Sequence, residues 1–403
     1  MVRIEHASGT HGWARLDGVD ILRGLAIFFV LMNHVNMRLD IANIPYTEGL
    51  PGQLVSSLMW NGQYGVQMFF AVSGFLITAT SLRRWGSLAS VSVRDFYALR
   101  FARIAPLLIL LLAVLSALHA AGLKDFIVTA KTGGLGRALV AALTFHLNVL
   151  EAQRGYLPGS WNILWSLSVE EMFYFFFPLT CWLLGRGKLL VVFLAVFVVL
   201  GPFGRIVLAH GNEIWQEESY LGGMDAIALG CLTAMALSRA HLSRSVLWTL
   251  GGAGAALLIF SLCFSNQAEV WGLVGSGFDM TMVAVGTCMI IAVAAQTRWM
   301  SPPVIAPLVR LGRRSYEVYL THMFVVFTLF NLFVSTGEPL RAVPVLFISV
   351  ILIAGLLGEL VARFYSDPMN RLLRRRLRDA RTQRRAAAPL SAKSCPAPRP
   401  RRR

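Results

Sequence analysis

The chain is poor in charge and in the residues that hold metals or disulfides. Only 14% of its 403 residues are charged and 56% are hydrophobic, whereas an average soluble domain has about 25% charged residues. Its five cysteines form no CxxC pair and no Cys/His ligand spacing, which argues against a zinc site and a disulfide framework. No internal repeat of the kind found in inverted-topology transporters is visible. The composition therefore indicates an integral membrane protein without a bound metal.

The net charge of +16 is unevenly distributed along the chain. Residues 371–403 contain 13 Lys and Arg against one acidic residue, which accounts for +12 of the total. The remainder carries little net charge, which argues against nucleic-acid binding. We expect the tail to be disordered and to lie on anionic membrane lipid, because it shows no apolar face. The sequence thus divides into a membrane-embedded domain, residues 1–370, and a disordered basic cytoplasmic tail, residues 371–403.

Ten apolar stretches are long enough to cross a bilayer, for which a helix needs about 20 residues. They lie near 19–37, 62–82, 104–121, 161–184, 189–209, 220–238, 246–264, 273–296, 315–336 and 343–365. A shorter apolar segment at 137–150 would move every later basic loop to the other side if it crossed. The positive-inside rule therefore favours a re-entrant or interfacial segment there. We expect an all-α bundle of about ten transmembrane helices with both termini in the cytoplasm.

The first span contains ionisable residues, although each costs about 2.5–3.5 kcal/mol at the bilayer centre on insertion scales. Arg23 and His34 are eleven residues apart. This spacing puts them within about 20° of one helical face and about 16.5 Å apart along the axis. Asp20 lies three residues before Arg23 and can pair with it. The pattern favours a functional face, and a helix-end histidine that bonds a neighbouring backbone group is the structural alternative.

The span at 161–184 contains the motif WSLSVEEMFY, in which Glu170 and Glu171 are adjacent. A carboxylate inside a span needs a cationic partner, and His34 lies at a similar depth to Glu170. Because adjacent helical residues point about 100° apart, we expect the two carboxylates to face different neighbours. A structural ion pair between two helices is the alternative role for Glu170.

Two arginines follow the second span, Arg100 and Arg103 in the motif RFAR, on one helical face. Arg binds phosphate through two hydrogen bonds, so the pair indicates a di- or triphosphate ligand such as a coenzyme. Ordinary positive-inside charge would also explain either residue.

The remaining candidates are polar residues within apolar segments. They are Ser73, Asp225, Tyr319 and His322. Ser73 has no strand-turn-helix context of the kind a nucleophilic serine needs, and the small pair Ser73-Gly74 favours close helix packing.

Taken together, these motifs resemble the acyltransferase 3 family of integral-membrane O-acyltransferases, which acylate bacterial surface polysaccharides, nodulation factors and some macrolides. The resemblance extends over most of the first 325 residues. It rests on Arg23 with ten residues before His34, FFAVSGFLI at 69–77, RFAR at 100–103, WSLSVEEMFY at 165–174 and SYEVYLTH at 315–322. It implies an acyltransferase of the bacterial inner membrane.

The resemblance also implies substrates and roles. The donor would be cytoplasmic acyl-CoA, usually acetyl-CoA, with no permanently bound cofactor, and the acceptor a hydroxyl of a cell-surface glycan or glycolipid. Arg23, Arg100 and Arg103 would hold the CoA phosphates. His34 would act as general base, with Glu170 orienting it.

Other mechanisms and functions fit the same residues. An acyl-His34 intermediate is the alternative mechanism. A proton-coupled transporter or flippase would use the same intramembrane charges, and a non-catalytic scaffold or sensor is a third class.

Overall fold

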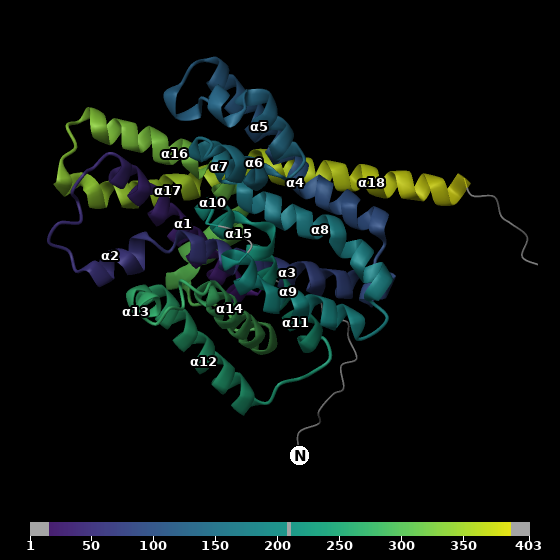
Figure 1. The fold of residues 1–403 in the computed structure, drawn as a ribbon. Helices are drawn as coiled ribbons and strands as arrows, with labels where there is room; N and C mark the ends of the chain where they lie inside the picture. Colours follow the sequence, from purple (N-terminus) through teal and green to yellow (C-terminus); the bar gives the residue numbers. More distant parts are fainter. Residues whose placement is uncertain (1–15, 208–210, 388–403) are drawn as a thin grey trace, which may run out of the picture.

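The computed structural model describes residues 16–207 and 211–387, and this part of the chain contains helices and loops but no strand. Within these residues, ten helical segments are long and apolar enough to cross a membrane. Their main helices are α1 (Asp17–Ile41), α3 (Gly62–Trp85), α4 (Val93–Ala120), α8 (Leu164–Leu184), α9 (Leu189–Ile206), α11 (Tyr220–Leu237), α12 (Arg244–Cys263), α14 (Phe278–Thr297), α16 (Ser315–Ser335) and α17 (Val343–Val361). The all-α bundle of ten spans predicted from the sequence is confirmed (Figure 1).

Shorter helices connect or extend the spans. They are α2 (Gly52–Met59), α5 (Gly134–Leu143), α6 (Leu147–Arg154), α7 (Gly159–Asn162), α10 (Glu213–Glu218), α13 (Ser265–Val270) and α15 (Ala306–Arg313). The helix α5 covers much of the ambiguous segment, and its ten residues reach about 15 Å, half of the hydrocarbon thickness. The helical segment 124–132 meets α5 at an angle of 96°. This geometry agrees with a re-entrant or interfacial segment.

The first helix lies inside the bundle and packs against α3, α14, α15 and α16. Its contact with α15 brings the two backbones together. A Cβ atom added to Gly312 would lie 1.8 Å from the carbonyl oxygen of Asp20, and one added to Gly24 would lie 2.3 Å from that of Leu308. Because only glycine fits at both crossings, the position of α15 fixes the part of α1 that carries Asp20 and Arg23.

A second close crossing joins α3 and α11. A Cβ atom on Gly74 would lie 1.9 Å from the carbonyl oxygen of Ile227, and one on Gly230 would lie 2.0 Å from that of Ala71. Small residues at such positions let helix backbones approach in a membrane, where packing rather than water exclusion drives association. The close packing predicted for Gly74 is confirmed.

Large apolar side chains cover the perimeter of the bundle. Trp248 on α12 is 72% exposed and Leu352 on α17 is 66% exposed. An apolar surface of this kind is unfavourable in water, and a bilayer would cover it.

The predicted disorder of the tail is wrong for residues 371–387. They belong to α18 (Asp367–Ala387), which continues α17 through a π-helical turn at Ala362–Ser366 (Figure 1). Met369, Leu372, Leu373 and Leu377 recur at helical spacing, and leucine and arginine are strong helix formers. These four residues form an apolar stripe on one side of the helix, which the many arginines around it conceal in the composition. Residues 388–403 lie outside the described part of the chain.

Candidate active site

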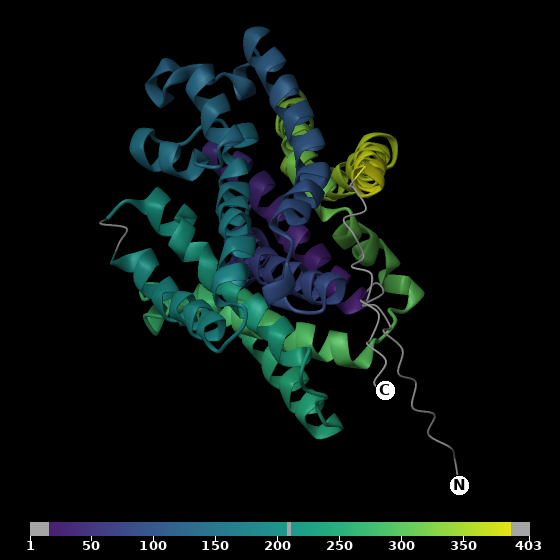
Figure 2. The same ribbon diagram turned by 90° about the vertical axis from the view of Figure 1, so that its right-hand side faces the viewer.

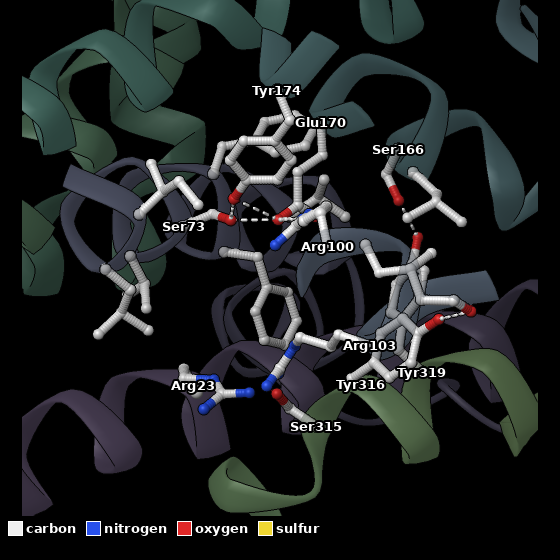
Figure 3. A pocket seen from close by; sticks show the side chains of 18 of the residues that line it. Arg23, Ser73, Arg100, Arg103, Ser166, Glu170, Tyr174, Ser315, Tyr316 and Tyr319 are labelled. Carbon is white, nitrogen blue, oxygen red and sulfur yellow. Dashed lines mark hydrogen bonds and ion pairs between the residues drawn. The ribbon is translucent and has the colours of Figure 1, made fainter. Parts of the chain in front are cut away.

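A cavity of about 320 Å³ lies among α1, α3, α4, α8 and α16 (Figure 3). Two helical faces supply five of its polar side chains. On α8, Ser166, Glu170 and Tyr174 recur every four residues, and on α16, Ser315 and Tyr319 do the same. Residues four apart lie on one side of a helix, so each motif found in the sequence presents one polar face to the cavity.

The guanidinium group of Arg100 is neutralised within one wall of the cavity. Its Nε and Nη2 atoms donate to Glu171 at 3.0 and 2.7 Å, and Nη2 donates to Glu170 at 3.2 Å. The group also lies 3.5 Å from the ring centre of Tyr174. Glu170 in turn accepts hydrogen bonds from Tyr174, at 2.8 Å, and from Ser73. The wall is therefore a closed cluster in which two carboxylates surround one cation.

Arg23 and Arg103 have a different environment. Figure 3 shows them with their guanidinium groups turned toward each other beside the hydroxyl of Ser315. Arg23 lies 3.6 Å from Asp20, but that carboxylate also accepts a hydrogen bond of 3.0 Å from Arg313. Arg103 forms no ion pair with any described side chain. Two cations thus converge on the cavity, and Asp20 is the only described carboxylate in an ion pair with either of them, an arrangement suited to an anion.

The two intramembrane histidines contact each other. The rings of His34 and His322 meet edge to face, with their centres 4.9 Å apart. The Nδ1 atom of His34 lies 2.8 Å from the carbonyl oxygen of Val30, and that of His322 lies 2.7 Å from that of Tyr319. A carbonyl oxygen only accepts, so these contacts assign the proton to Nδ1 in each neutral ring and leave Nε2 as the base. The ring of His34 is half-buried and that of His322 is fully buried.

The side chain of Tyr319 separates the cavity from the histidines. Its hydroxyl contacts the hydroxyl of Ser166 at 2.7 Å and donates to the carbonyl of Ile163 at 3.0 Å. Its ring centre lies 6.1 Å from that of Phe69 and 5.7 Å from that of His322. Tyr319 and Phe69 line the cavity, whereas neither His34 nor His322 is among its lining residues.

The structure brings together some of the predicted site residues and separates others. Arg23, Ser73, Arg103 and Tyr319 all line the cavity, and the predicted pairing of Asp20 with Arg23 is present. Among the described contacts, none joins His34 to Glu170 as expected. Glu170 forms an ion pair with Arg100 instead, and His34 contacts the carbonyl oxygen of Val30. Glu171, which we expected to face a different neighbour, binds the same arginine. Its adjacency to Glu170 was the available signal, since a long arginine side chain can bridge two helical positions.

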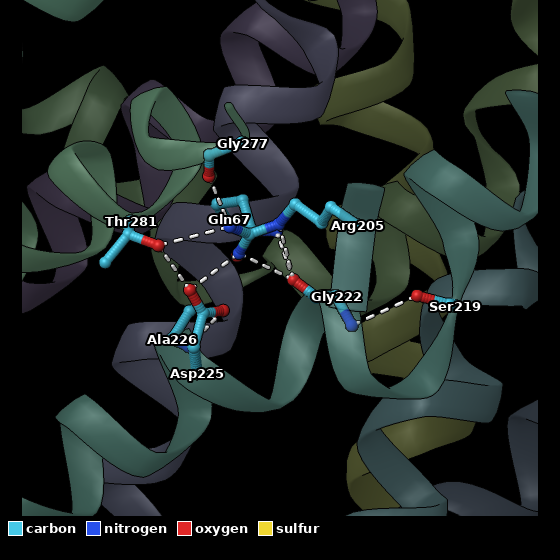
Figure 4. A network of polar contacts seen from close by, with 8 residues as sticks. All are labelled: Gln67, Arg205, Ser219, Gly222, Asp225, Ala226, Gly277 and Thr281. Atoms are coloured by element: carbon cyan, nitrogen blue, oxygen red, sulfur yellow. Dashed lines mark hydrogen bonds and ion pairs between the residues drawn. The ribbon is translucent and has the colours of Figure 1, made fainter. Parts of the chain in front are cut away.

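Asp225 lies in a separate network at α9, α11 and α14 (Figure 4). Its carboxylate is 2.6 Å from Arg205, and Arg205 also donates to the carbonyls of Gly222 and Gly277 and to the hydroxyl of Thr281. Arg205 and Asp225 are 4% and 0% exposed. Every nitrogen of this guanidinium group has a protein acceptor, so the network joins three helices and leaves no free group for a ligand.

Comparison with known proteins identifies the family. A family model described as an acyltransferase domain, that of acyltransferase 3, matches residues 16–361. The chain belongs to this family. Among its relatives is "O-acetyltransferase OatA" of Staphylococcus aureus (strain NCTC 8325 / PS 47), which is 24% identical over 373 residues. "Putative O-acetyltransferase SACOL0978" of S. aureus (strain COL) is 25% identical over 378 residues.

Each of these alignments covers 88% of the chain and 57% of the relative. The chain thus spans somewhat more than half the length of the curated relatives it matches. No solved structure matches the chain.

Proposed function

We propose that this protein is a membrane O-acyltransferase that moves an acetyl group from acetyl-CoA to a hydroxyl of a cell-surface glycan or glycolipid. The donor would enter from the cytoplasm and both termini would lie on that side of the bacterial inner membrane. The observation that supports the proposal is that Arg23 and Arg103 converge in one cavity. The chain also belongs to a family of acyltransferases. The names of the two staphylococcal relatives favour acetyl as the acyl group.

The distribution of charge suggests how the donor binds. Phosphate groups of CoA would lie at Arg23, which shares Asp20 with Arg313, and at Arg103, which forms no ion pair with a described side chain. Along α1, Arg23 and His34 are about 16.5 Å apart, so the pantetheine arm would run along this helix toward His34. In this proposal Arg100 has no direct contact with phosphate, since two carboxylates already hold it. Its role is to fix the wall that contains Glu170.

His34 would supply the base. The Nε2 atom would take the proton of the acceptor hydroxyl as its oxygen attacks the thioester carbonyl. The C–S bond then breaks, and the proton returns from His34 to the departing CoA thiolate, which yields the ester and CoA with a free thiol. The hydrogen bond from Nδ1 to Val30 holds the ring in the tautomer that this step needs.

An acyl-His34 intermediate is the competing route, in which Nε2 attacks the thioester first. Incubation of the purified protein with acetyl-CoA labelled in the acetyl group, without acceptor, separates the two. Direct transfer predicts no label on the protein. Label that is bound to the wild type and absent from His34→Ala would establish the intermediate.

Mass spectrometry of surface glycans and lipids tests the proposed function in cells. We expect an acetyl-sized mass difference between cells with the gene and cells without it, and we expect His34→Ala cells to resemble the latter. Equal amounts of inserted protein in the two gene-bearing strains provide the control. A transporter would instead change the amount of a glycan without changing its acetylation, and that result would refute the proposal.

A further inference from the structure

A second cavity, of about 950 Å³, is lined by residues of α1, α15 and α17. Both α15 and α17 pack against α1 and α16. The cavity extends to Asp367, where α18 begins, and Figure 2 shows α18, in yellow, at the edge of the bundle. One part of the lining is charged and another is apolar. The function proposed above uses Arg23 from this lining and leaves the cavity itself without a role.

The position of the cavity is that of a membrane–water interface. In the segment that leads into α15, Met300 and Val304 are each 82% exposed, and Trp299 is exposed as well. Exposed tryptophan and aliphatic side chains beside a basic helix are typical of an interface. On the other wall, Leu352 of α17 lines the cavity and is also exposed on the apolar perimeter. The cavity therefore opens toward lipid at the end of the bundle where headgroups lie.

The carboxylates in the lining are held by arginines. They are Asp20, Glu359 and Asp367. Asp20 accepts a hydrogen bond of 3.0 Å from Arg313, which also donates to Asp17 at 2.8 Å. Glu359 and Asp367 each accept one of 2.9 Å from Arg314. Among the described residues, the lining thus contains no unpaired carboxylate that would repel an anion.

Arg310 differs from the other arginines of the lining. Arg313 and Arg314 are paired, and Arg23 lies 3.6 Å from Asp20. The side chain of Arg310 is exposed and forms no hydrogen bond or ion pair with any described residue. A guanidinium group binds phosphate through two hydrogen bonds, and basic pockets between transmembrane helices bind lipid headgroups. The charged part of the lining therefore complements one phosphate group.

A glycine makes room in the apolar part of the lining. A Cβ atom on Gly358 would lie 2.3 Å from the side chain of Val318, so that glycine is needed where α17 crosses α16. A Cβ atom on Gly355 would meet only Leu311, at 3.6 Å, which is ordinary contact. No close helix crossing requires Gly355, although glycine weakens a helix. Its missing side chain instead leaves space beside Phe28 and Leu311, which also line the cavity.

We propose that this cavity binds an anionic phospholipid, with its phosphate at Arg310 and one acyl chain along Phe28, Leu311 and Gly355. Acetyl-CoA would offer the same phosphate chemistry but has no long apolar chain for this wall. The inference is independent of the proposed function, because it concerns a cavity and a ligand that acetyl transfer does not use.

The test places the full-length protein in phosphatidylcholine nanodiscs with a trace of phosphatidylglycerol that carries a photoreactive diazirine in one acyl chain. Peptide mass spectrometry then locates the label after irradiation. Phe28 reports the cavity, because it lines the cavity from the inner helix α1. Leu356 reports the surrounding bilayer, because it is exposed on α17 and does not line the cavity. The measured quantity is the ratio of label at Phe28 to label at Leu356.

In the wild type we expect label at both residues. Replacing part of the phosphatidylcholine by unlabelled phosphatidylglycerol should lower the ratio, whereas added CoA should not. Absence of label from Phe28, or a ratio that phosphatidylglycerol leaves unchanged, would overturn the proposal. A ratio that CoA lowers and phosphatidylglycerol does not would assign the cavity to CoA and would overturn it as well.

Variants at the two parts of the cavity test the two contacts separately. Arg310→Ala should lower the ratio about fivefold, and Arg310→Lys should recover part of the loss. The matched control is Arg239→Ala, at an exposed arginine outside the lining. Equal ratios in Arg310→Ala and Arg239→Ala would refute the phosphate contact.

Gly355→Leu should abolish label at Phe28 and leave label at Leu356 unchanged, because the new side chain would fill the space assigned to the acyl chain. Its control is Gly252→Leu, at an exposed glycine of α12 where a Cβ atom would meet nothing within 4 Å. Equal labelling of Phe28 in these two variants would show that no acyl chain enters the cavity.

Discussion

Two arginine sites in this bundle, one buried and one that lines an open cavity, differ in how their charge is balanced. Arg205 donates to three backbone or hydroxyl oxygens and to Asp225, and its side chain is nearly inaccessible. Arg23 and Arg103 line one cavity, and Asp20 is the only described carboxylate that forms an ion pair with either of them. Both sites place ionisable groups where a bilayer disfavours them. The difference indicates that unsatisfied charge, rather than intramembrane charge as such, marks a binding site.

Breaking the balanced site should have the largest effect on stability. We expect Asp225→Ala to lower the free energy of unfolding by about 3–5 kcal/mol, because Arg205 would remain buried without its counter-charge. CoA affinity per folded molecule should not change. Thermal unfolding in detergent measures the first effect. A double variant, Arg205→Met with Asp225→Leu, should be more stable than Asp225→Ala, and a less stable double variant would contradict this interpretation.

Removing charge from the unbalanced site should have the opposite profile. Arg103→Ala should weaken CoA binding about ten- to a hundredfold, as expected for the loss of a charge-assisted hydrogen bond to phosphate. Its thermal stability should equal that of the wild type, because no ion pair is lost. Exposed Arg239, outside the cavity, provides the control variant Arg239→Ala. An Arg103→Ala protein that is less stable than the wild type, but whose folded molecules bind CoA normally, would contradict this prediction.

Protonation is a third way to balance a buried charge, and Glu151 on α6, outside the spans, provides the example. This carboxyl group is fully buried beside Glu218, and both accept hydrogen bonds from Asn162. Burial raises the pKa of Glu151 to about 8. The folded state therefore binds a proton that the unfolded state has released between about pH 4.5 and pH 8, so stability contributed by this group falls as the pH rises through that interval.

Glu151→Gln should remove this pH dependence. At pH 8 we expect the variant to exceed the wild type by on the order of 1–3 kcal/mol in free energy of unfolding, and we expect the advantage to disappear near pH 5. Thermal unfolding at both pH values tests this. Equal differences at the two pH values would show that Glu151 does not titrate in this interval.

The smallest effect should come from Tyr319→Phe. It removes the hydroxyl contacts with Ser166 and Ile163 and keeps the ring that lies between the cavity and the histidines. We expect a loss of about 0.5–1.5 kcal/mol of stability and a less than tenfold decrease in acetyl transfer. Tyr319→Ala should decrease transfer further. Identical rates of acetyl transfer for the two variants would show that the aromatic ring of Tyr319 does not contribute to transfer.

The sequence predicted the helices and six of the residues that line the cavity, because apolar spans and polar helical faces both leave a periodic signal. Ten apolar stretches and the four-residue spacing of the polar groups on α8 are local patterns. The pairing between helices could not be predicted. We expected Glu170 and His34 to lie at similar depths, but the partner of Glu170 is Arg100 of α4, and the ring that contacts His34 is that of His322 of α16. Depth constrains one coordinate of a side chain, whereas the choice of partner depends on how the helices cross.

The tail shows a related limit. Its composition favours disorder, but the apolar stripe of α18 and its continuation from α17 give a helix through Ala387. A net charge averaged over 33 residues conceals apolar residues that recur every three or four positions.

The most direct test of the central claim uses sealed membrane vesicles from cells that produce the wild type or His34→Ala. Acetyl-CoA with a labelled acetyl group is added outside inside-out vesicles, which expose the cytoplasmic face, and outside right-side-out vesicles. Our account predicts label in glycan or lipid only with wild-type, inside-out vesicles. Equal labelling of both orientations, or undiminished labelling with His34→Ala, would contradict it.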